Sequence, residues 1–422
     1  MKDRVILHCD LNNFFASVEM LLHPELEGHA VAVCGDPEKR HGIILAKNMA
    51  AKSVGVKTAE PVWKAMQKCP NLVLVPPTYK KYAEFSSLVY SVYTEFTSEV
   101  ESFGLDECWL DVTGCQKLFG SGKEIADKVR LRVKEKTGGL TVSVGVSYNK
   151  IFAKLGSDIK KPDAVTIIDK DNYKDIAWKL PVSQLLYVGR TTAERLDRFN
   201  IKTIGDLARA DQDFLVRQFG KAGAKLSEYA RGEDSESVKC YTEKHIPDSV
   251  GNGTTTAQDI TNFGDATSII FALSEMVGFR LRQSEMLASG VSIYYRDTRF
   301  KNTSRQGKLF SPTSSAYDIA TKALDLLKAN YDFSRMLPLR MVTISAYGLV
   351  SGGEYVQTDI FASEGEKKSK LDISVDRLRK KYGYGILRRG VTIETIFSCD
   401  SREAEDDFLP FDKTRKGSPP SE

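Results

Sequence analysis

Two adjacent acids between two strand-like segments place the strongest constraint on how this chain folds. Asp106 and Glu107 lie in the run 101–111, which has apolar, strand-like ends, so we expect the pair at the tip of a hairpin. A third acid, Asp10, ends another strand-like run, Val5–Cys9. Three carboxylates at neighbouring strand ends can form an oxygen-only cage that suits Mg²⁺. Two such ions can clamp the attacking and leaving oxygens of a phosphoryl transfer. Taken singly, each acid is better explained as an ordinary turn or surface residue.

Composition narrows the class of protein. The 422 residues suffice for about three domains of roughly 150 residues each. A hydrophobic fraction of 41% and a charged fraction of 27% are ordinary for a globular protein, and a net charge of +4 permits a nucleic-acid partner. No signal peptide and no apolar run of the roughly 20 residues that cross a bilayer is found, so no membrane partner is expected. The seven cysteines are odd in number and include no Cys-x-x-Cys pair, which favours reduced thiols and a cytoplasmic protein.

The order of predicted elements divides the chain. Strands mixed with helices up to about residue 168 predict an α+β core whose sheet carries antiparallel pairing. Short helices follow from 172 to 231, two of them joined by Tyr187–Thr191. After a polar linker, residues 249–346 show a βαββαβ pattern, and near the end Ile373–Lys381 could form a helix. In the α+β core before about residue 168, strands are predicted at Val5–Cys9, Ala30–Cys34, Gly42–Leu45, Leu72–Val75, Val100–Phe103, Trp109–Val112 and Thr141–Val146.

Five stretches, in one unbroken order over roughly residues 1 to 350, resemble the Y-family (translesion) DNA polymerases, most closely their DinB, or DNA polymerase IV, branch. A lone Asp-Glu pair would be weak support, but the five stretches together are specific. They are Asp10–Glu19, Lys47–Gly55, Gly104–Glu107, Val144–Lys154 and Asp158–Pro162.

The resemblance implies a multidomain α+β protein with the right-hand arrangement of a polymerase. Its parts would be a palm (1–10 and 76–168), small fingers (11–75) and a helical thumb with a helix-hairpin-helix (169–235). These would be followed by a linker (236–244), a βαββαβ little finger (245–349) and a tail (350–422). The tail is predicted to contain a clamp-binding peptide and to be disordered in part.

The resemblance also implies the catalytic residues. Asp10, Asp106 and Glu107 would hold two Mg²⁺ ions, with the backbone carbonyl of Leu11 as a further ligand. One ion would lower the pKa of the primer 3′-hydroxyl, and the other would hold the triphosphate. Phosphoryl transfer depends on positioning and charge neutralisation more than on protein nucleophiles, which agrees with this assignment. Asp111 is expected to be structural.

For the incoming nucleotide, the resemblance places an aromatic ring, Phe15, under the sugar. Such a ring would clash with a 2′-hydroxyl and act as a steric gate that favours deoxynucleotides. Phe14 would point into the core, and Asn13 and Phe14 are grouped with Phe15 as nucleotide-site residues. Without the surrounding motif, Phe15 would read as a plain core aromatic.

Cations for the triphosphate would come from Lys52 on the fingers and from Lys161, which precedes a proline in the palm. Three positions depart from the common family pattern: Ala46 and Met49 replace Thr and Tyr, and Lys52 replaces Arg. Because lysine lacks the bidentate fork of arginine, the nucleotide contacts are expected to differ in detail while the metal cage is unaffected.

DNA contacts would be mostly to phosphates, as suits an enzyme that must accept any sequence. Gly189 and Arg190 lie in a segment that resembles the family's helix-hairpin-helix, and an ordinary helix connection is the alternative. The run 296–308 holds five basic residues against one acid, Asp297, so 5 − 1 gives a local charge of +4, and a solvated charged hairpin is the alternative. The basic residues are Arg296, Arg299, Lys301, Arg305 and Lys308.

A partner peptide is predicted near the C-terminus. The run 356–361 resembles the short peptide with which bacterial polymerases bind the sliding clamp (β subunit), with Gln357, Ile360 and Phe361 as its contacts. The expected partners are therefore primer–template DNA, dNTPs and the clamp, and the chain is expected to be a monomer.

The leading hypothesis is a low-fidelity, template-directed DNA polymerase that adds dNTPs by two-metal phosphoryl transfer, without proofreading, in translesion synthesis and DNA repair. A nucleotidyl cyclase is the first alternative, because related palm-like folds use paired acids. A catalytically idle DNA- or clamp-binding protein is the second.

Overall fold

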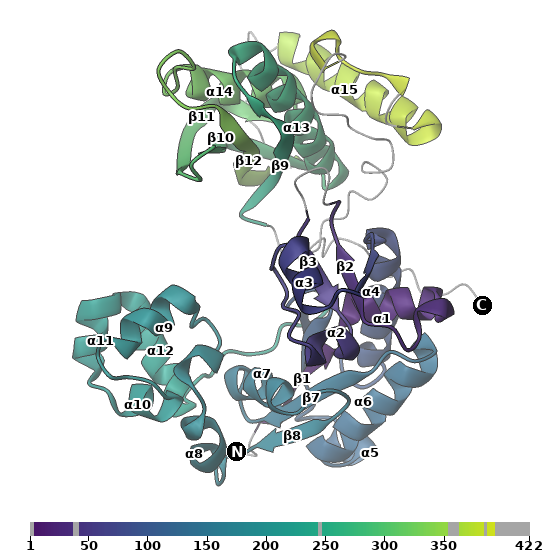
Figure 1. Ribbon diagram of the computed structural model, residues 1–422, viewed down its shortest axis with the longest axis vertical. Coiled ribbons are helices and arrows are strands. Elements are labelled where there is room, and N and C mark those ends of the chain that lie inside the picture. The colour runs from purple at the N-terminus through teal and green to yellow at the C-terminus, as the bar shows by residue number, and fades with distance from the viewer. Residues whose placement is uncertain (1–3, 37–41, 244–246, 353–362, 384–385, 393–422) are drawn as a thin grey trace. The chain divides into compact units, whose positions relative to one another are not determined.

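The computed structural model of the chain describes residues 4–36, 42–243, 247–352, 363–383 and 386–392, with the backbone alone for 363–370. The chain divides into two units, one formed by residues 4–34 and 43–243 and the other mainly by the residues from 247 onward (Figure 1). No helix in the described ranges combines the length and the apolar character needed to cross a membrane.

A five-stranded sheet forms the centre of the first unit. Its central strand, β1, pairs antiparallel with β6 on one side and β7 on the other. The strand order is β5 (Val100–Ser102), β6 (Glu107–Asp111), β1 (Ile6–Leu11), β7 (Val142–Ser147) and β8 (Val165–Ile168).

The two faces of this sheet are covered by different helices. Because side chains alternate along a strand, Leu7, Cys9 and Leu11 of β1 face one way and pack with residues of α1, α4 and α6. His8 and Asp10 face the other way, toward α7. The helices are α1 (Phe14–Leu22), α4 (Tyr79–Thr94), α6 (Gly122–Thr137) and α7 (Lys150–Ile159), and short α5 (Gln116–Phe119) and η1 (Pro24–Leu26) lie between them in the chain.

Strand β8 was not predicted, and it adds a parallel pair to the predicted antiparallel pairing. β7 pairs with β8 in parallel, in the register Val144 to Val165, so the sheet is mixed. The connection between the two strands is α7, which lies against both. A parallel pair needs such a crossover, so β8 follows from the position of α7.

Helix α7 approaches the sheet so closely that one position of β7 must be glycine. A Cβ at Gly145 would lie 1.9 Å from the carbonyl oxygen of Ala153 and 2.5 Å from the backbone nitrogen of Ser157. Gly145 stands opposite His8 in the sheet, and Gly156 of α7 contacts the Gly145 backbone. The side chains of α7 are therefore held within reach of β1.

Two smaller bodies complete the first unit. A three-stranded sheet orders β3 (Ile44–Lys47), β2 (Val31–Cys34) and β4 (Val73–Val75) and carries helices α2 (Met49–Ser53) and α3 (Val62–Lys68). The other body is helical and consists of α8 (Tyr173–Ile176), η2 (Ala177–Lys179), η3 (Val182–Gln184), α9 (Arg190–Asp197), α10 (Ile204–Arg209), α11 (Gln212–Phe219) and α12 (Lys221–Arg231). The segment before Tyr187–Thr191 is only the 3-10 turn η3, not the first of two helices as predicted, because Pro181 and the loop after Gln184 leave room for a single turn.

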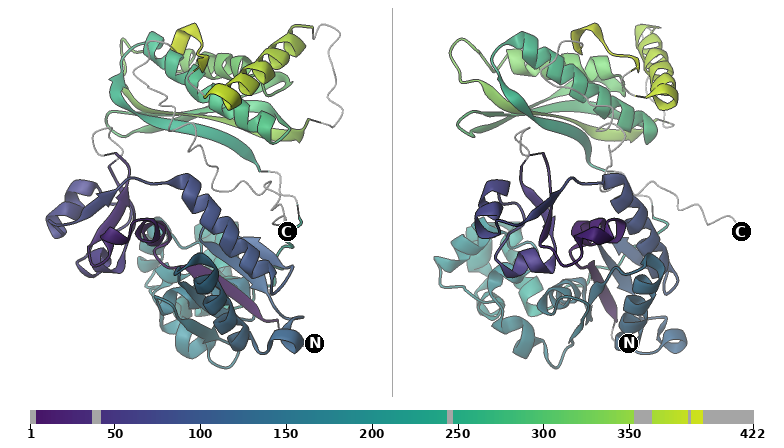
Figure 2. Two further views of the ribbon diagram at one scale, coloured as in Figure 1. Left: turned by 90° about the vertical axis from the view of Figure 1, so that its right-hand side faces the viewer. Right: turned by 45° about the vertical axis from the view of Figure 1, so that its right-hand side comes forward.

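The second unit has the predicted βαββαβ order. Its four-stranded antiparallel sheet, β11-β10-β12-β9, carries its helices on one face (Figure 2). The elements are β9 (Ser249–Ile260), α13 (Phe263–Gln283), β10 (Met286–Asp297), β11 (Asn302–Thr313), α14 (Ala316–Lys328) and β12 (Leu339–Ser351).

A C-terminal helix, α15 (Ser363–Tyr382), and the turn η5 (Gly390–Thr392) also belong to this unit. The helix is longer than the predicted Ile373–Lys381. It is joined to α13 by buried ion pairs, in which Arg282 bonds Asp376 at 2.6 and 3.0 Å and Arg379 bonds Glu275 at 3.0 Å. The predicted clamp-binding peptide (Gln357, Ile360, Phe361) and the predicted disorder at 399–422 lie outside the described residues.

Candidate active site

The strand register brings the predicted acids together. Asp10 and Glu107 stand directly opposite each other on β1 and β6, on the face that looks toward α7. Asp106 precedes β6 in the loop, and its carbonyl oxygen accepts a hydrogen bond of 2.9 Å from the backbone N–H of Leu11. The first acid and the acidic tip, about 96 positions apart in the sequence, are thus joined by one strand pairing.

Two lysines neutralise this pair of acids. The Lys154 ammonium lies 3.2 Å from Asp10 and 3.0 Å from Glu107, and the Lys161 ammonium lies 2.8 Å from Asp10. Asp158 links the two lysines, at 3.1 and 3.0 Å. Lys154 and Asp158 are four residues apart on α7, so both fall on the helix face that lies against β1.

Burial and charge separate the pKa values of the acids. Burial and the charge of Glu107 raise the pKa of Asp10 to about 6, against the opposing pull of the two lysines. Burial and Glu107 also raise the pKa of Asp106. Burial acts upward on Glu107 as well, but His8 and Lys154 outweigh it and hold the pKa of Glu107 well below its usual range. Glu107 is therefore the carboxylate most firmly kept ionised.

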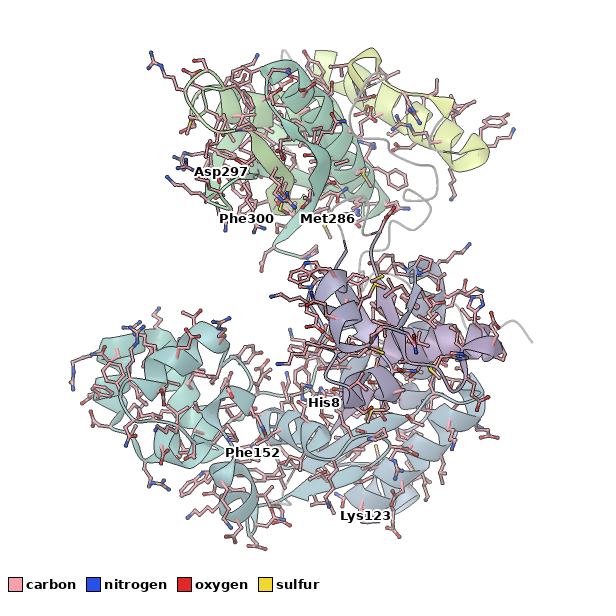
Figure 3. The ribbon with its side chains drawn as sticks, in the orientation of Figure 1. His8, Lys123, Phe152, Met286, Asp297 and Phe300 are labelled. Carbon is pink, nitrogen blue, oxygen red and sulfur yellow. The ribbon has the colours of Figure 1, made fainter. Side chains whose placement is uncertain are left out.

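A histidine lies behind Glu107. His8 is fully buried on β1 (Figure 3), and its Nε2 atom lies 3.4 Å from the Glu107 carboxylate. Its Nδ1 atom lies 2.9 Å from the hydroxyl of Ser157 on α7.

The donor set suits a hard cation but does not form a closed cage. Among the described residues, no three His, Cys, Asp or Glu side chains converge closely enough to hold a metal ion by themselves. The side chains of Asp10 and Glu107 supply only oxygen, they already attract lysine ammonium groups, and Oε2 of Glu107 is buried without a hydrogen-bond partner. Mg²⁺ is commonly bound by one or two carboxylates, with substrate phosphates and water completing its shell. These residues therefore fit Mg²⁺ bound together with a triphosphate.

Phe15 lies in the first turn of α1. Its ring stacks on Tyr82 of α4, with centroids 4.1 Å apart and planes 10° apart. The Tyr82 hydroxyl donates a hydrogen bond to the buried carboxylate of Glu19, which fixes the platform beneath Phe15. Phe14 is buried in the core, as predicted. Asn13, at the N-terminal end of α1, has the left-handed backbone conformation, with φ 50°.

The predicted triphosphate cations differ in their surroundings. Lys161 already belongs to the acidic cluster, whereas Lys52 is exposed on α2. Lys47 donates to the hydroxyl of Thr58 at 2.9 Å, and burial and the charge of Lys52 lower its pKa. Met49 is 41% exposed, so this substituted position offers an open apolar surface.

The predicted DNA contacts lie on exposed surfaces. Gly189 caps the N-terminus of α9, and the Arg190 side chain is 91% exposed and paired with Glu194 at 2.7 Å. On the hairpin of β10 and β11, Arg299, Lys301, Arg305 and Lys308 are exposed. Arg296 is half-buried, and its guanidinium donates to Tyr294 and Asn302. Asp111, expected to be structural, accepts a hydrogen bond of 2.9 Å from the backbone of Thr113.

Sequence reasoning missed three residues of the acidic cluster: His8, Lys154 and Asp158. Each carries a signal that spacing could have revealed. His8 is two residues before Asp10 and therefore on the same strand face, and Lys154 and Asp158 share a helix face by their spacing of four.

Comparison with known proteins finds family matches along most of the chain. Residues 9–158 match the model of the impB/mucB/samB family, 247–360 match the C-terminal domain of the same family, and 184–234 match a domain described as DNA polymerase-iota, thumb domain. DNA polymerase IV of Acetivibrio thermocellus is 47% identical over 93% of this chain and 98% of its own length. DNA polymerase IV 1 of Halalkalibacterium halodurans is 33% identical over 99% of this chain and 97% of its own length.

A solved structure matches at the level of the fold. The Y-family DNA polymerase chimera Dbh-Dpo4(243-245)-Dbh superposes with a TM-score of 0.72 and 23% identity, over 82% of this chain and 99% of the chimera.

Proposed function

Because the chain belongs to the impB/mucB/samB family, and with it to the Y-family DNA polymerases of the DinB branch, we propose that the cluster of Asp10, Asp106 and Glu107 is its catalytic centre. The chain is a template-directed DNA polymerase of low fidelity, metal-dependent and without proofreading, that serves translesion synthesis. DNA and dNTPs are its substrates. Family membership excludes the nucleotidyl cyclase that the paired acids alone would have allowed.

The observation that carries the proposal is the placement of Asp10 opposite Glu107, with the loop acid Asp106 bonded to the next residue of β1. We assign Asp10, Asp106, Glu107 and the carbonyl of Leu11 as the residues that would hold two Mg²⁺ ions. Bound there, the ions would supply activation of the primer 3′-hydroxyl and neutralisation of the triphosphate charge.

The chain's own residues prepare the site for this chemistry. The antiparallel pairing of β1 with β6 holds the carboxylates at fixed spacing, so little reorganisation is needed when substrate binds. Lys161 lies at the edge of the acids, 25% exposed, and can exchange a carboxylate for a triphosphate oxygen. Lys154 is less exposed, at 13%, and balances the negative charge that remains.

Nucleotide selection is assigned to Phe15. Its ring is only partly buried, and the stack on Tyr82 prevents it from moving away from a 2′-hydroxyl. Phe14 supports it from the core, and Asn13 turns the backbone into the first turn of α1. Lys52 is the further cation that we assign to the triphosphate.

The DNA backbone is assigned to the N-terminus of α9, through Gly189 and Arg190, and to the basic hairpin, through Arg296, Arg299, Lys301 and Arg305. Backbone N–H groups at a helix N-terminus bind phosphate, and the hairpin presents four exposed cations, Arg299, Lys301, Arg305 and Lys308. Both contacts are independent of base sequence, as translesion synthesis requires.

The sliding clamp is the proposed protein partner, and the support is the peptide sequence alone. Replacing both Ile360 and Phe361 by Ala should abolish clamp-stimulated synthesis, because these side chains would fill an apolar pocket, and should spare basal synthesis. Equal stimulation of the double variant and the wild type would refute the assignment. A monomeric, cytoplasmic enzyme fits these partners.

Primer extension tests the catalytic centre. Wild-type protein should extend a primed template with dNTPs and Mg²⁺, and Asp106→Ala should not. Asp111→Asn is the matched control, because Asp111 lies on the same strand as Glu107 but its side chain contacts the Thr113 backbone and Arg4, away from the acids. Extension by Asp106→Ala at the wild-type rate would refute the site. If the wild type and both variants bind the duplex but none extends the primer, the result would instead support a catalytically idle binding protein.

A further inference from the structure

His8 lies between the hydroxyl of Ser157 and the carboxylate of a proposed metal ligand, Glu107. The ring is 0% exposed and packs edge-on against Trp109, with centroids 5.2 Å apart. Nδ1 lies 2.9 Å from the Ser157 hydroxyl, and Nε2 lies 3.4 Å from Oε2 of Glu107. Side chains of β6 and α7 thus contact one imidazole of β1.

One buried atom of His8 and one of Glu107 lack a hydrogen bond. Among the described residues, Nε2 of His8 and Oε2 of Glu107 have no other hydrogen-bond partner, and 3.4 Å is longer than a formed bond. A buried polar atom left without a hydrogen bond is destabilising, and these two atoms face each other at 3.4 Å. A small movement of the carboxylate would satisfy both.

The direction in which the Ser157 hydroxyl donates its single proton decides which ring nitrogen of His8 carries the N–H. Ser157 can donate to the carbonyl oxygen of Lys154, 2.8 Å away, or to Nδ1 of His8. In the first case Nδ1 carries the imidazole proton, and Nε2 turns a lone pair toward the carboxylate, which is repulsive. In the second case Nε2 carries the proton and donates it to Glu107. The Lys154 carbonyl already accepts the helical bond from residue 158, so it loses little in this arrangement.

We propose that His8 is a positioning residue, which donates from Nε2 to Oε2 of Glu107 and thereby turns Oε1 toward the metal. The inference rests on the proposed role of Glu107 as a ligand. Oε1 is the oxygen that already faces a cation, the ammonium of Lys154 at 3.0 Å. Groups that bond a metal-ligating side chain from behind fix its orientation, and their loss typically weakens metal affinity about 10- to 100-fold.

The role needs one ring N–H that donates and one ring nitrogen that accepts from Ser157, which is what a neutral imidazole offers.

Two substitutions separate positioning from packing. His8→Phe keeps an aromatic ring against Trp109 but removes both nitrogens, and His8→Gln restores an N–H donor near the position of Nε2. We would titrate each full-length protein with Mn²⁺ alone and measure free Mn²⁺ by electron paramagnetic resonance. His8→Phe should bind Mn²⁺ about 10- to 100-fold more weakly than wild type, and His8→Gln should recover most of the affinity. Equal affinity of His8→Phe and wild type would overturn the proposal.

A measurement without metal keeps the proposal testable if His8→Phe does not fold. The ¹⁵N shifts of histidine-labelled wild type, with His8 assigned by its loss in His8→Gln, should show the Nε2–H tautomer, and the Nδ1–H tautomer would overturn the proposal. Glu107→Gln separates this inference from the catalytic site itself. If Glu107→Gln loses Mn²⁺ affinity and His8→Phe does not, only the positioning role fails. If Glu107→Gln binds Mn²⁺ as wild type does, the ligand assignment fails too.

Discussion

Replacing Gly145 by Ala should damage the site without touching any of its polar side chains. The new Cβ would lie 1.9 Å from the carbonyl oxygen of Ala153, and ordinary contact begins near 3.4 Å, so α7 and β7 must separate by 3.4 − 1.9 = 1.5 Å. Both clashing atoms are backbone atoms, so no rotamer change can relieve the overlap. Lys154 moves with α7, and its bonds of 3.2 and 3.0 Å to Asp10 and Glu107 would be lost.

Overpacking of this kind typically costs about 1–3 kcal/mol of stability, and a displacement of about 1 Å at a catalytic site can cost about 100-fold in rate. We therefore expect Gly145→Ala to lower kcat for primer extension about 100-fold while DNA binding is retained. Denaturant unfolding and single-turnover extension would measure the two effects. Gly114→Ala is the matched control, since nothing lies within 4 Å of a Cβ there. A Gly145→Ala protein with wild-type kcat would refute the reasoning.

Three further predictions follow from particular contacts. Phe15→Ala should admit ribonucleotides while deoxynucleotide addition stays measurable, and unchanged sugar selectivity in single-nucleotide insertion would contradict the gate. Asp10 has a pKa of about 6, so below that pH it is protonated and the rate at limiting Mg²⁺ should fall about tenfold per pH unit. Raising Mg²⁺ should move the midpoint to lower pH, because the ion binds the ionised form, and a midpoint independent of Mg²⁺ would count against this. Arg282→Met removes the ion-pair partner of Asp376 on α15 and should cost about 3–5 kcal/mol in denaturant unfolding, whereas Arg335→Met, at an 86% exposed side chain, should be close to neutral.

The sequence was informative wherever local pattern and chemistry agreed. Apolar periodicity predicted most strands and helices of the first unit and the βαββαβ order of the second, and the acids at strand ends predicted which strands must meet. Pairing partners were harder. The strand Val165–Ile168 is short and β-branched, but its parallel place beside β7 depends on the path of α7, which local spacing does not encode.

The site was predictable in its acids and not in its neutralising partners. Lys154 contacts Asp10 across 144 positions of sequence, and only the close approach of α7 brings them together. His8 looks like one more residue of a buried strand until the hydroxyl of Ser157 and the carboxylate of Glu107 are seen on either side of it. Such residues are defined by tertiary contacts between elements, and no single segment contains the signal.

The bridging of Asp10 and Glu107 by Lys154 has a consequence for the enzyme between reactions. If Mg²⁺ alone balanced the charge of the carboxylates, they would repel one another whenever an ion left the site. Here an ammonium group remains beside the acids, so the resting enzyme keeps its shape and is ready to load again. Departure of products and preservation of the site are thereby separate events.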